Sequence, residues 1–183
     1  MASNGYMTPF ASLLSVAERS NQLKGELPLR ENAQTLWAGL GFNLLGQRFV
    51  VPLDEVAETM RVPQATRLPG VKEFVIGIGN VRGRLMAILD LAIFFGKLSG
   101  LGVSQRRVLA VEDEEQYFGF IIDESLGMQH FPSDAFEEAV EEIDDMFKPY
   151  IRGAYRVAGT VWPILSLTAL AEHPELEQLA VAS

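Results

Sequence analysis

Short runs of apolar residues, separated by glycine, proline and charged residues, fill the chain from residue 37 to residue 166. Runs of four to eight such residues bounded by turn residues are typical of β-strands. A first hairpin around Gly46 is predicted by "AGLGFNLL" and "RFVVPL". A second hairpin, which turns at Arg82-Gly83, is predicted by "VIGIGNV" and "RLMAIL". Further strands are predicted at "RRVLAVE", "QYFGFIID", "LGMQHF", "YIRGAYRV" and "TVWPIL". We therefore expect an all-β protein.

A few segments have a helical pattern instead. Residues 8–24 begin with Thr-Pro, a good N-cap and first helical residue, and predict an N-terminal helix that a linker joins to the strands. A short helical turn is predicted at "DEVAETM", and the chain from Ser166 onward is predicted to be helical or frayed. Residues 132–148 predict an amphipathic helix with an acidic outer face, because four apolar residues recur at helical spacing: Phe136, Val140, Ile143 and Phe147.

Two blocks of the sequence recur in the same order. An offset of 76 residues lays residues 77–91 over 153–167, and an offset of 69 lays residues 47–55 over 116–124. Each half is thus a hairpin, a connector and a hairpin with a glycine at its corner. Because such short strands cannot bury both faces in one open sheet, we expect each half to curl into a small barrel. The two barrels would share the large apolar residues that neither covers alone.

Composition and charge narrow the classes of partner. The chain has 183 residues, 48% of them hydrophobic, with a formal charge of −9 and no cysteine. The negative charge argues against nucleic acid and against anionic membrane surfaces, and the lack of cysteine excludes disulfides and thiol chemistry. The first ten residues lack the pattern of a signal peptide, and no apolar run approaches the roughly 18 residues of a membrane helix. We therefore expect a cytoplasmic protein without direct membrane insertion.

The sequence contains no convincing catalytic, metal or cofactor constellation. His130 and His173 have no second ligand at metal-binding spacing, and we interpret both as locally satisfied. "GIGNVRG" resembles a dinucleotide loop, but the residues that follow it predict a strand and not a helix. The acidic residues 112–115 fall at a predicted hairpin turn, where a solvated cluster is the usual case. We expect no enzymatic activity, no cofactor and no bound metal.

The second glycine corner is the unusual feature of the surface. Asn80 and Gly83 suit the backbone of a tight turn, whereas Arg82 is not needed for it. The guanidinium of Arg82 suits a carboxylate or exposed carbonyls on another protein. Pairing with an internal acid, Asp90 or Glu58, is an equally good interpretation from spacing alone.

The region around this corner, "GVKEFVIGIGNVRGRLMAILDL", resembles the signature of the CheW family of chemotaxis coupling proteins. Three further blocks resemble the family in the same order: "GQRFVVPLDEVAETMRVPQATRLPG", "RRVLAVEDEEQYFGFIIDESLGM" and "YIRGAYRVAGTVWPILSLTAL". The resemblance covers about residues 37–172. Within the family, "TPF", "LPGVK", "NVRGRL", "FFG" and "GMQHFP" resemble the subgroup of type IV pilus coupling proteins.

The resemblance implies a fold and a domain organisation. The implied fold is two five-stranded SH3-like β-barrels that share a core, with short connector helices. The implied CheW-like domain spans 37–172, with intertwined subdomains of roughly 37–100 and 101–172. Residues 1–36 would then be the N-terminal helix and linker, and residues 173–183 a C-terminal tail.

The resemblance also implies a function. The chain would be a non-enzymatic adaptor that couples the cytoplasmic tips of methyl-accepting chemoreceptors to the regulatory domain of a CheA-type histidine kinase. It would act in twitching motility, at polar, membrane-associated receptor arrays. Two alternatives stay open at this point: a flagellar-type coupling protein, and a double barrel that binds a small molecule in the cleft between its barrels.

The resemblance places a set of residues on family positions implicated in partner contact or on the adjoining loop: Val56, Glu58, Thr66, Arg67, Asn80, Arg82 and Gly83. We expect Arg82 and Glu58 to be polar contacts and Val56 an apolar one. One departure concerns a helix cap, because Ser166 stands where the family usually has an acidic residue. The missing acidic cap would lower the stability by about 1 kcal/mol if nothing replaces it.

Overall fold

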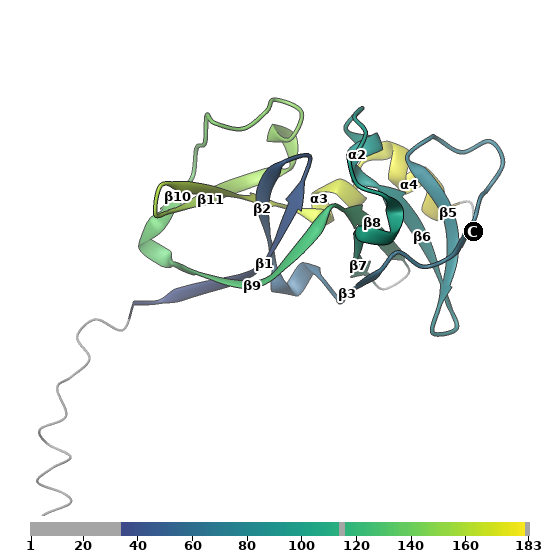
Figure 1. The fold of residues 1–183 in the computed structure, drawn as a ribbon, viewed down its shortest axis with the longest axis horizontal. Helices are drawn as coiled ribbons and strands as arrows, with labels where there is room; N and C mark the ends of the chain where they lie inside the picture. Colours follow the sequence, from purple (N-terminus) through teal and green to yellow (C-terminus); the bar gives the residue numbers. More distant parts are fainter. Residues whose placement is uncertain (1–33, 114–115, 182–183) are drawn as a thin grey trace, which may run out of the picture. The chain divides into compact units, whose positions relative to one another are not determined.

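The computed structural model describes residues 34–113 and 116–181, and these form two six-stranded sheets and several short helices (Figure 1). The helix predicted at residues 8–24 lies outside the described residues. The first sheet has the order β10-β11-β12-β2-β1-β9. Its strands are β1 (Leu36–Leu44), β2 (Gln47–Pro52), β9 (Glu124–Pro132), β10 (Phe136–Glu137), β11 (Ile151–Val157) and β12 (Thr160–Leu165).

The second sheet has the matching order β4-β5-β6-β8-β7-β3. Its strands are β3 (Glu58–Arg61), β4 (Ala65–Thr66), β5 (Val75–Val81), β6 (Arg84–Asp90), β7 (Arg107–Glu112) and β8 (Tyr117–Ile122). Among the described residues, each sheet therefore has five longer strands and one strand of two residues. The predicted all-β class and both predicted hairpins are confirmed. The strand after Gly83 is also confirmed, so the glycine-rich segment does not lead into a helix.

The internal repeat appears in the structure as an exchange of hairpins. The hairpin β1-β2 of the first half joins β11-β12 of the second half, through a parallel pairing of β2 with β12. The hairpin β7-β8 of the second half joins β5-β6 of the first half, through a parallel pairing of β6 with β8. The expectation that each half curls into its own barrel is therefore wrong. Asp123 is the only residue between β8 and β9, so the chain runs straight from one sheet into the other. The proposed bounds of the domain, 37–172, stay a prediction.

The two sheets share the largest buried cluster. Alternate residues of a strand point to opposite faces, so a strand buried on both faces serves two cores. In β8, Phe120 and Ile122 belong to the shared cluster, while Ile121 belongs to a smaller cluster within the second sheet. In β2, Phe49 belongs to the shared cluster and Val50 to a smaller cluster within the first sheet. The expected sharing of large apolar residues between the barrels is confirmed.

The helix predicted at residues 132–148 does not form. A 3₁₀ turn, η3 (Ser133–Ala135), leads into β10, and an irregular segment ends at a second 3₁₀ turn, η4 (Lys148–Tyr150). In a helix Glu137 and Glu142 would project into an acidic surface, where like charges repel. Here both carboxylates bind Arg156 of β11, at 2.8 Å and 3.3 Å. The segment instead buries Ile143 in the core. At its start, the two residues of β10 pair with β11.

Equivalent short helices follow the last strand of each glycine-cornered hairpin: α2 (Leu91–Phe94) after β6 and α3 (Leu167–Ala171) after β12. The Asp90 carboxylate caps α2 by accepting from the backbone N–H of Ala92. At α3 the Ser166 hydroxyl accepts from the Ala169 N–H at 3.2 Å, and the Glu55 carboxylate accepts from the Leu167 N–H at 2.6 Å. Glu55 comes from the 3₁₀ turn η1 (Leu53–Glu55), so a distant acid replaces the one that Ser166 lacks.

The chain continues into α4 (Pro174–Val181), which packs on the shared core. Leu176 of this helix is 1% exposed and belongs to the shared cluster. A fourth 3₁₀ turn, η2 (Val103–Gln105), precedes β7. Along the described part of the chain, no helix has both the length and the apolar character that a bilayer span requires.

Candidate partner-binding site

The predicted site begins with the two-residue turn between β5 and β6. Val81 pairs with Arg84, and the residues between them, Arg82 and Gly83, have φ angles of +54° and +81°. Positive φ at both central residues is the requirement of a type I′ turn, whose twist matches that of the strands. The Asn80 side chain accepts a hydrogen bond from the Gly83 N–H at 2.9 Å. The prediction that Asn80 and Gly83 shape the turn is confirmed.

Arg82 pairs with one of the two acids considered from the sequence. Its Nη2 lies 2.8 Å from Oε2 of Glu58, on β3, which is the last strand at the other end of the sheet order. Asp90 is instead buried and binds Arg106, with 2.5 Å between Oδ2 and Nη1. The Arg82 side chain is still 79% exposed, whereas that of Glu58 is 24% exposed. The internal pair therefore leaves most of the guanidinium free to meet another protein.

Three residues that the sequence did not single out complete this surface. The Tyr117 hydroxyl, at the start of β8, donates to Oε1 of Glu58 at 3.0 Å. The Arg84 guanidinium lies 4.7 Å from the centre of the Tyr117 ring, and Arg84 also pairs with Glu112 at the end of β7. We call Glu58, Arg82, Arg84, Glu112 and Tyr117 the Arg82 surface. No sequence pattern indicated Tyr117, and Glu112 was interpreted as part of a solvated turn.

The electrostatics of Tyr117 keep it a hydrogen-bond donor. Burial is the largest cause that raises the pKa of its phenol above 10.0, followed by the hydrogen bond to Glu58 and the charge of that carboxylate. The charges of Arg82 and Arg84 act in the opposite direction and are smaller. At neutral pH the hydroxyl therefore carries its proton and donates to Glu58.

The other predicted residues lie around the same sheet with different surroundings. Val56 follows η1, is half-buried and packs against the shared core, so it offers little surface to a partner. Thr66 on β4 and Asn80 both line a hollow of about 510 Å³ whose rim includes the exposed Leu85. Arg67 lines a separate hollow next to Ile93. The structure thus brings Glu58 together with the corner, and it does not bring Arg67 there.

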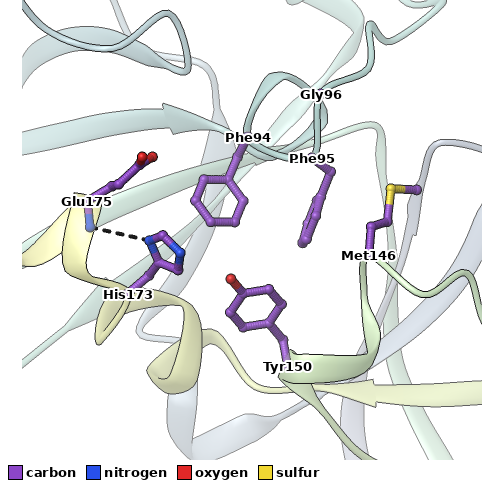
Figure 2. A pocket seen from close by; sticks show the side chains of 7 residues that line it. All are labelled: Phe94, Phe95, Gly96, Met146, Tyr150, His173 and Glu175. Atoms are coloured by element: carbon purple, nitrogen blue, oxygen red, sulfur yellow. Dashed lines mark hydrogen bonds between the residues drawn. The ribbon is translucent and has the colours of Figure 1, made fainter.

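A pocket of about 470 Å³ is a candidate for the alternative function, the binding of a small molecule (Figure 2). Aromatic rings of Phe94, Phe95, Tyr150 and His173 line it and contact one another, with 5.3 Å between the ring centres of Phe94 and His173. The His173 Nδ1 accepts from the backbone N–H of Glu175 at 3.3 Å, so this histidine is locally satisfied, as predicted. The Glu175 carboxylate pairs with a lysine outside the pocket lining. The lining thus consists mainly of aromatic rings and includes a single carboxylate, that of Glu175.

Within residues 34–113 and 116–181, no three side chains of histidine, cysteine, aspartate or glutamate lie together in a way that could hold a metal ion. The Arg82 surface itself offers charged side chains that can form hydrogen bonds with a partner.

Comparisons with known proteins agree with the resemblance drawn from the sequence. The CheW-like domain family matches residues 38–175. The chain is 42% identical over 175 residues to Protein PilI of Pseudomonas aeruginosa, covering 95% of this chain and 97% of that protein. It is 25% identical over 111 residues to the chemotaxis protein CheW of Helicobacter pylori, covering 61% and 67% of the two chains.

The solved structures agree on the fold. The scaffolding protein TtCheW from Thermoanaerobacter tengcongensis superposes with a TM-score of 0.67 at 21% identity, over 77% of this chain and 96% of that one. The likeness confirms the predicted architecture of two SH3-like barrels that share a core. The family match over most of the chain and the 42% identity to PilI lead to one conclusion: the chain belongs to the CheW family of chemotaxis coupling proteins.

Proposed function

We propose that this chain is a non-enzymatic adaptor of a type IV pilus chemosensory system. It binds the regulatory domain of a CheA-type histidine kinase and the cytoplasmic tip of a methyl-accepting chemoreceptor. It works in the cytoplasm, at polar receptor arrays, and through the kinase it affects twitching motility. The 42% identity to PilI, over nearly the full length of both chains, supports the pilus assignment over the flagellar alternative.

One observation carries the binding role of the Arg82 surface. Arg82 occupies a backbone conformation that costs a residue with a side chain of order 1–3 kcal/mol, and its side chain is 79% exposed. Its counterpart in the internal repeat, Ala158, makes the same turn at a φ of +50° without any charged group. Folding therefore has no need of an arginine at the corner, and partner binding supplies a reason for it.

The mechanism is a difference in binding free energy between kinase states. An adaptor that binds the active state of the kinase more tightly shifts the kinase toward that state, by no more than this difference. One or two charged contacts are enough, because 1.4 kcal/mol changes an equilibrium tenfold. The shared core holds the two sheets together as one body. Receptor and kinase can then each contact a different part of its surface.

The test is a calorimetric titration of the chain into the purified regulatory domain of its kinase. Arg82→Asp is the parallel sample, and Ala158→Asp is the matched control, because it places the same residue at the equivalent turn of the other sheet. We expect binding by the wild type, a loss of tenfold or more for Arg82→Asp, and wild-type affinity for Ala158→Asp.

Three results would contradict the proposal or a part of it. If the wild type binds neither the kinase domain nor the receptor tip, the chain is not the adaptor. If it binds receptor tips of a flagellar system as tightly as those of the pilus system, the flagellar assignment replaces the pilus one. Equal losses for Arg82→Asp and Ala158→Asp would move the binding site away from the corner.

A further inference from the structure

A single carboxylate on the Arg82 surface is held from two sides. Oε2 of Glu58 pairs with Arg82 at 2.8 Å, and Oε1 accepts the Tyr117 hydroxyl at 3.0 Å. These residues come from β3, the β5-β6 turn and β8, which are far apart in the sequence. Without Tyr117, one oxygen of Glu58 would lose its protein partner, and the carboxylate would be free to change rotamer. Tyr117 therefore restrains the group that restrains Arg82.

Tyr117 also supports the second arginine of the surface. The Arg84 guanidinium lies over the phenol ring, 4.7 Å from its centre, in a cation–π contact. Glu112 pairs with Arg84 from β7, where it lies opposite Tyr117 in the pairing of β7 with β8. The ring of Tyr117 thus restrains Arg84, while its hydroxyl restrains Arg82 through Glu58.

The internal repeat shows that the fold does not require this network. The positions of Arg82, Arg84 and Tyr117 correspond to Ala158, Thr160 and Arg48 in the other half. Ala158 and Gly159 nevertheless close the β11-β12 turn with φ angles of +50° and +76°, close to those of the Arg82 turn. The network is therefore an addition to one sheet.

The exposed groups of the surface indicate the chemistry of the partner. The side chains of Arg82 and Arg84 are 79% and 50% exposed, whereas Glu58 is 24% exposed and Tyr117 is half-buried. A partner that approaches this surface meets two guanidinium groups first. Guanidinium groups bind carboxylates in a planar, two-pronged geometry, which makes their orientation important.

We infer that Tyr117 is a positioning residue for partner binding, which aims Arg82 through Glu58 and Arg84 through its ring at carboxylates of the partner protein. The inference rests on the proposed function and identifies how the same surface is organised. Holding two flexible side chains in place before binding lowers the entropy that binding must remove, so the effect falls on affinity.

The experiment is a double-mutant cycle on the dissociation constant for the kinase regulatory domain. Its members are the wild type, Tyr117→Phe, Glu58→Ala and the double variant. Tyr117→Phe removes the hydroxyl and keeps the ring over Arg84. We expect it to weaken binding about 3- to 10-fold, the scale of a single hydrogen bond, in a chain that is still folded at the temperature of the titration. In the Glu58→Ala background the same change should have less than about a twofold effect, because its link to Arg82 is already gone.

A control and a second substitution separate positioning from a general structural role. Tyr155→Phe removes a hydroxyl from a tyrosine that is 5% exposed in the first sheet, and should leave affinity unchanged. Tyr117→Leu removes the ring as well, and should weaken binding further than Tyr117→Phe. Arg84→Ala should then lower affinity in the Tyr117→Phe background and have little effect in the Tyr117→Leu background.

The outcomes distinguish this inference from the proposed function. If the wild type binds and Arg82→Asp does not, but Tyr117→Phe binds like the wild type, the inference is wrong and the function stands. Additive losses of Tyr117→Phe and Glu58→Ala would also contradict it. If the wild type binds the receptor fragment and not the kinase domain, the same cycle is run on the receptor fragment. Binding to neither overturns both.

Discussion

The two equivalent β-turns of the repeat differ in one side chain that matters. Arg82-Gly83 closes β5 and β6, and Ala158-Gly159 closes β11 and β12, each with positive φ at both residues. Both turns hold a side-chain residue in a left-handed conformation, for which asparagine or glycine is the better choice. The alanine shows what the fold needs at this place. The arginine shows what has been added, a charged group directed outward and tied to Glu58.

The two helix starts of the repeat show a second contrast. Asp90 caps α2 and is bound by the buried Arg106, whereas Ser166 caps α3 together with Glu55, which pairs with the exposed Arg152 at 3.1 Å. The same structural need is met once by a buried ion pair and once by a hydroxyl and a borrowed carboxylate. Because these contacts lie inside the structure, we expect changes at the helix starts to affect stability. We expect changes at the turns to affect partner binding instead.

The largest effect is expected from the buried ion pair. Arg106→Ala leaves Asp90 without its cation, and Asp123, whose Oδ1 lies 3.3 Å from Arg106 Nε, loses the same partner. Removing one partner of a buried pair costs about 3–5 kcal/mol. Chemical denaturation should show this loss of unfolding free energy, while Arg152→Ala, which removes a 56% exposed side chain, should cost about 1 kcal/mol or less. Equal losses would contradict the contrast between the two helix starts.

A smaller effect is expected at the borrowed cap. Glu55→Ala leaves the Leu167 N–H and the Ser166 hydroxyl without an acceptor, and it removes a side chain that is only 7% exposed. The expected loss is about 1–2 kcal/mol, the usual cost of a lost helix cap. Glu124→Ala is the control, because residue 124 occupies the equivalent place in the repeat and is exposed. A thermal melt that shows no difference between the two variants would mean that Ser166 caps α3 alone.

The two turns should respond alike in stability. Ala158→Asn places a residue that tolerates positive φ, and should raise the unfolding free energy by up to about 1 kcal/mol. Arg82→Asn also lowers the cost of the positive φ, but it removes one exposed ion pair, which contributes about 0–1 kcal/mol. Its net change should therefore stay within about 1 kcal/mol. A large destabilisation by Arg82→Asn in urea titrations would show that the arginine is structural.

The smallest effect concerns alkaline pH. The folded-state pKa of Tyr117 is raised, so the stability that its protonated hydroxyl contributes is complete below the unfolded pKa of about 10. It is lost as the pH rises through the higher folded value. Between pH 9 and pH 11, Tyr117→Phe should lose less stability than the wild type. An identical pH dependence of the two melting temperatures would indicate that Tyr117 does not donate to Glu58.

Local patterns predicted the parts of the fold that local physics decides. The apolar runs and the glycine corners predicted the hairpins, because a two-residue turn with positive φ needs nothing beyond its own sequence. These patterns did not predict the exchange of hairpins between the sheets, and only the family resemblance implied that the two halves are intertwined. The exchange depends on pairings between strands of different halves, β2 with β12 and β6 with β8. The false helix at residues 132–148 has the same origin, because Arg156, distant from the segment's start, binds its acids and favours an extended course.

The candidate site was predicted in part for the same reason. Arg82 stood out because an arginine is unusual at such a turn, and the family resemblance added Glu58. Tyr117 became visible only when β8 was placed beside β6, because cross-strand neighbours leave no periodic signal in a single sequence. Their roles in partner binding stay predictions.

The central claim is that the fold needs the turn and the partner needs the arginine. The most direct test is to titrate the kinase regulatory domain with the wild type, Arg82→Asn and Ala158→Asn, and to melt the same three samples. The account predicts similar melting temperatures for all three, wild-type affinity for Ala158→Asn, and at least a tenfold weaker affinity for Arg82→Asn. Unchanged affinity of Arg82→Asn with unchanged stability would contradict it.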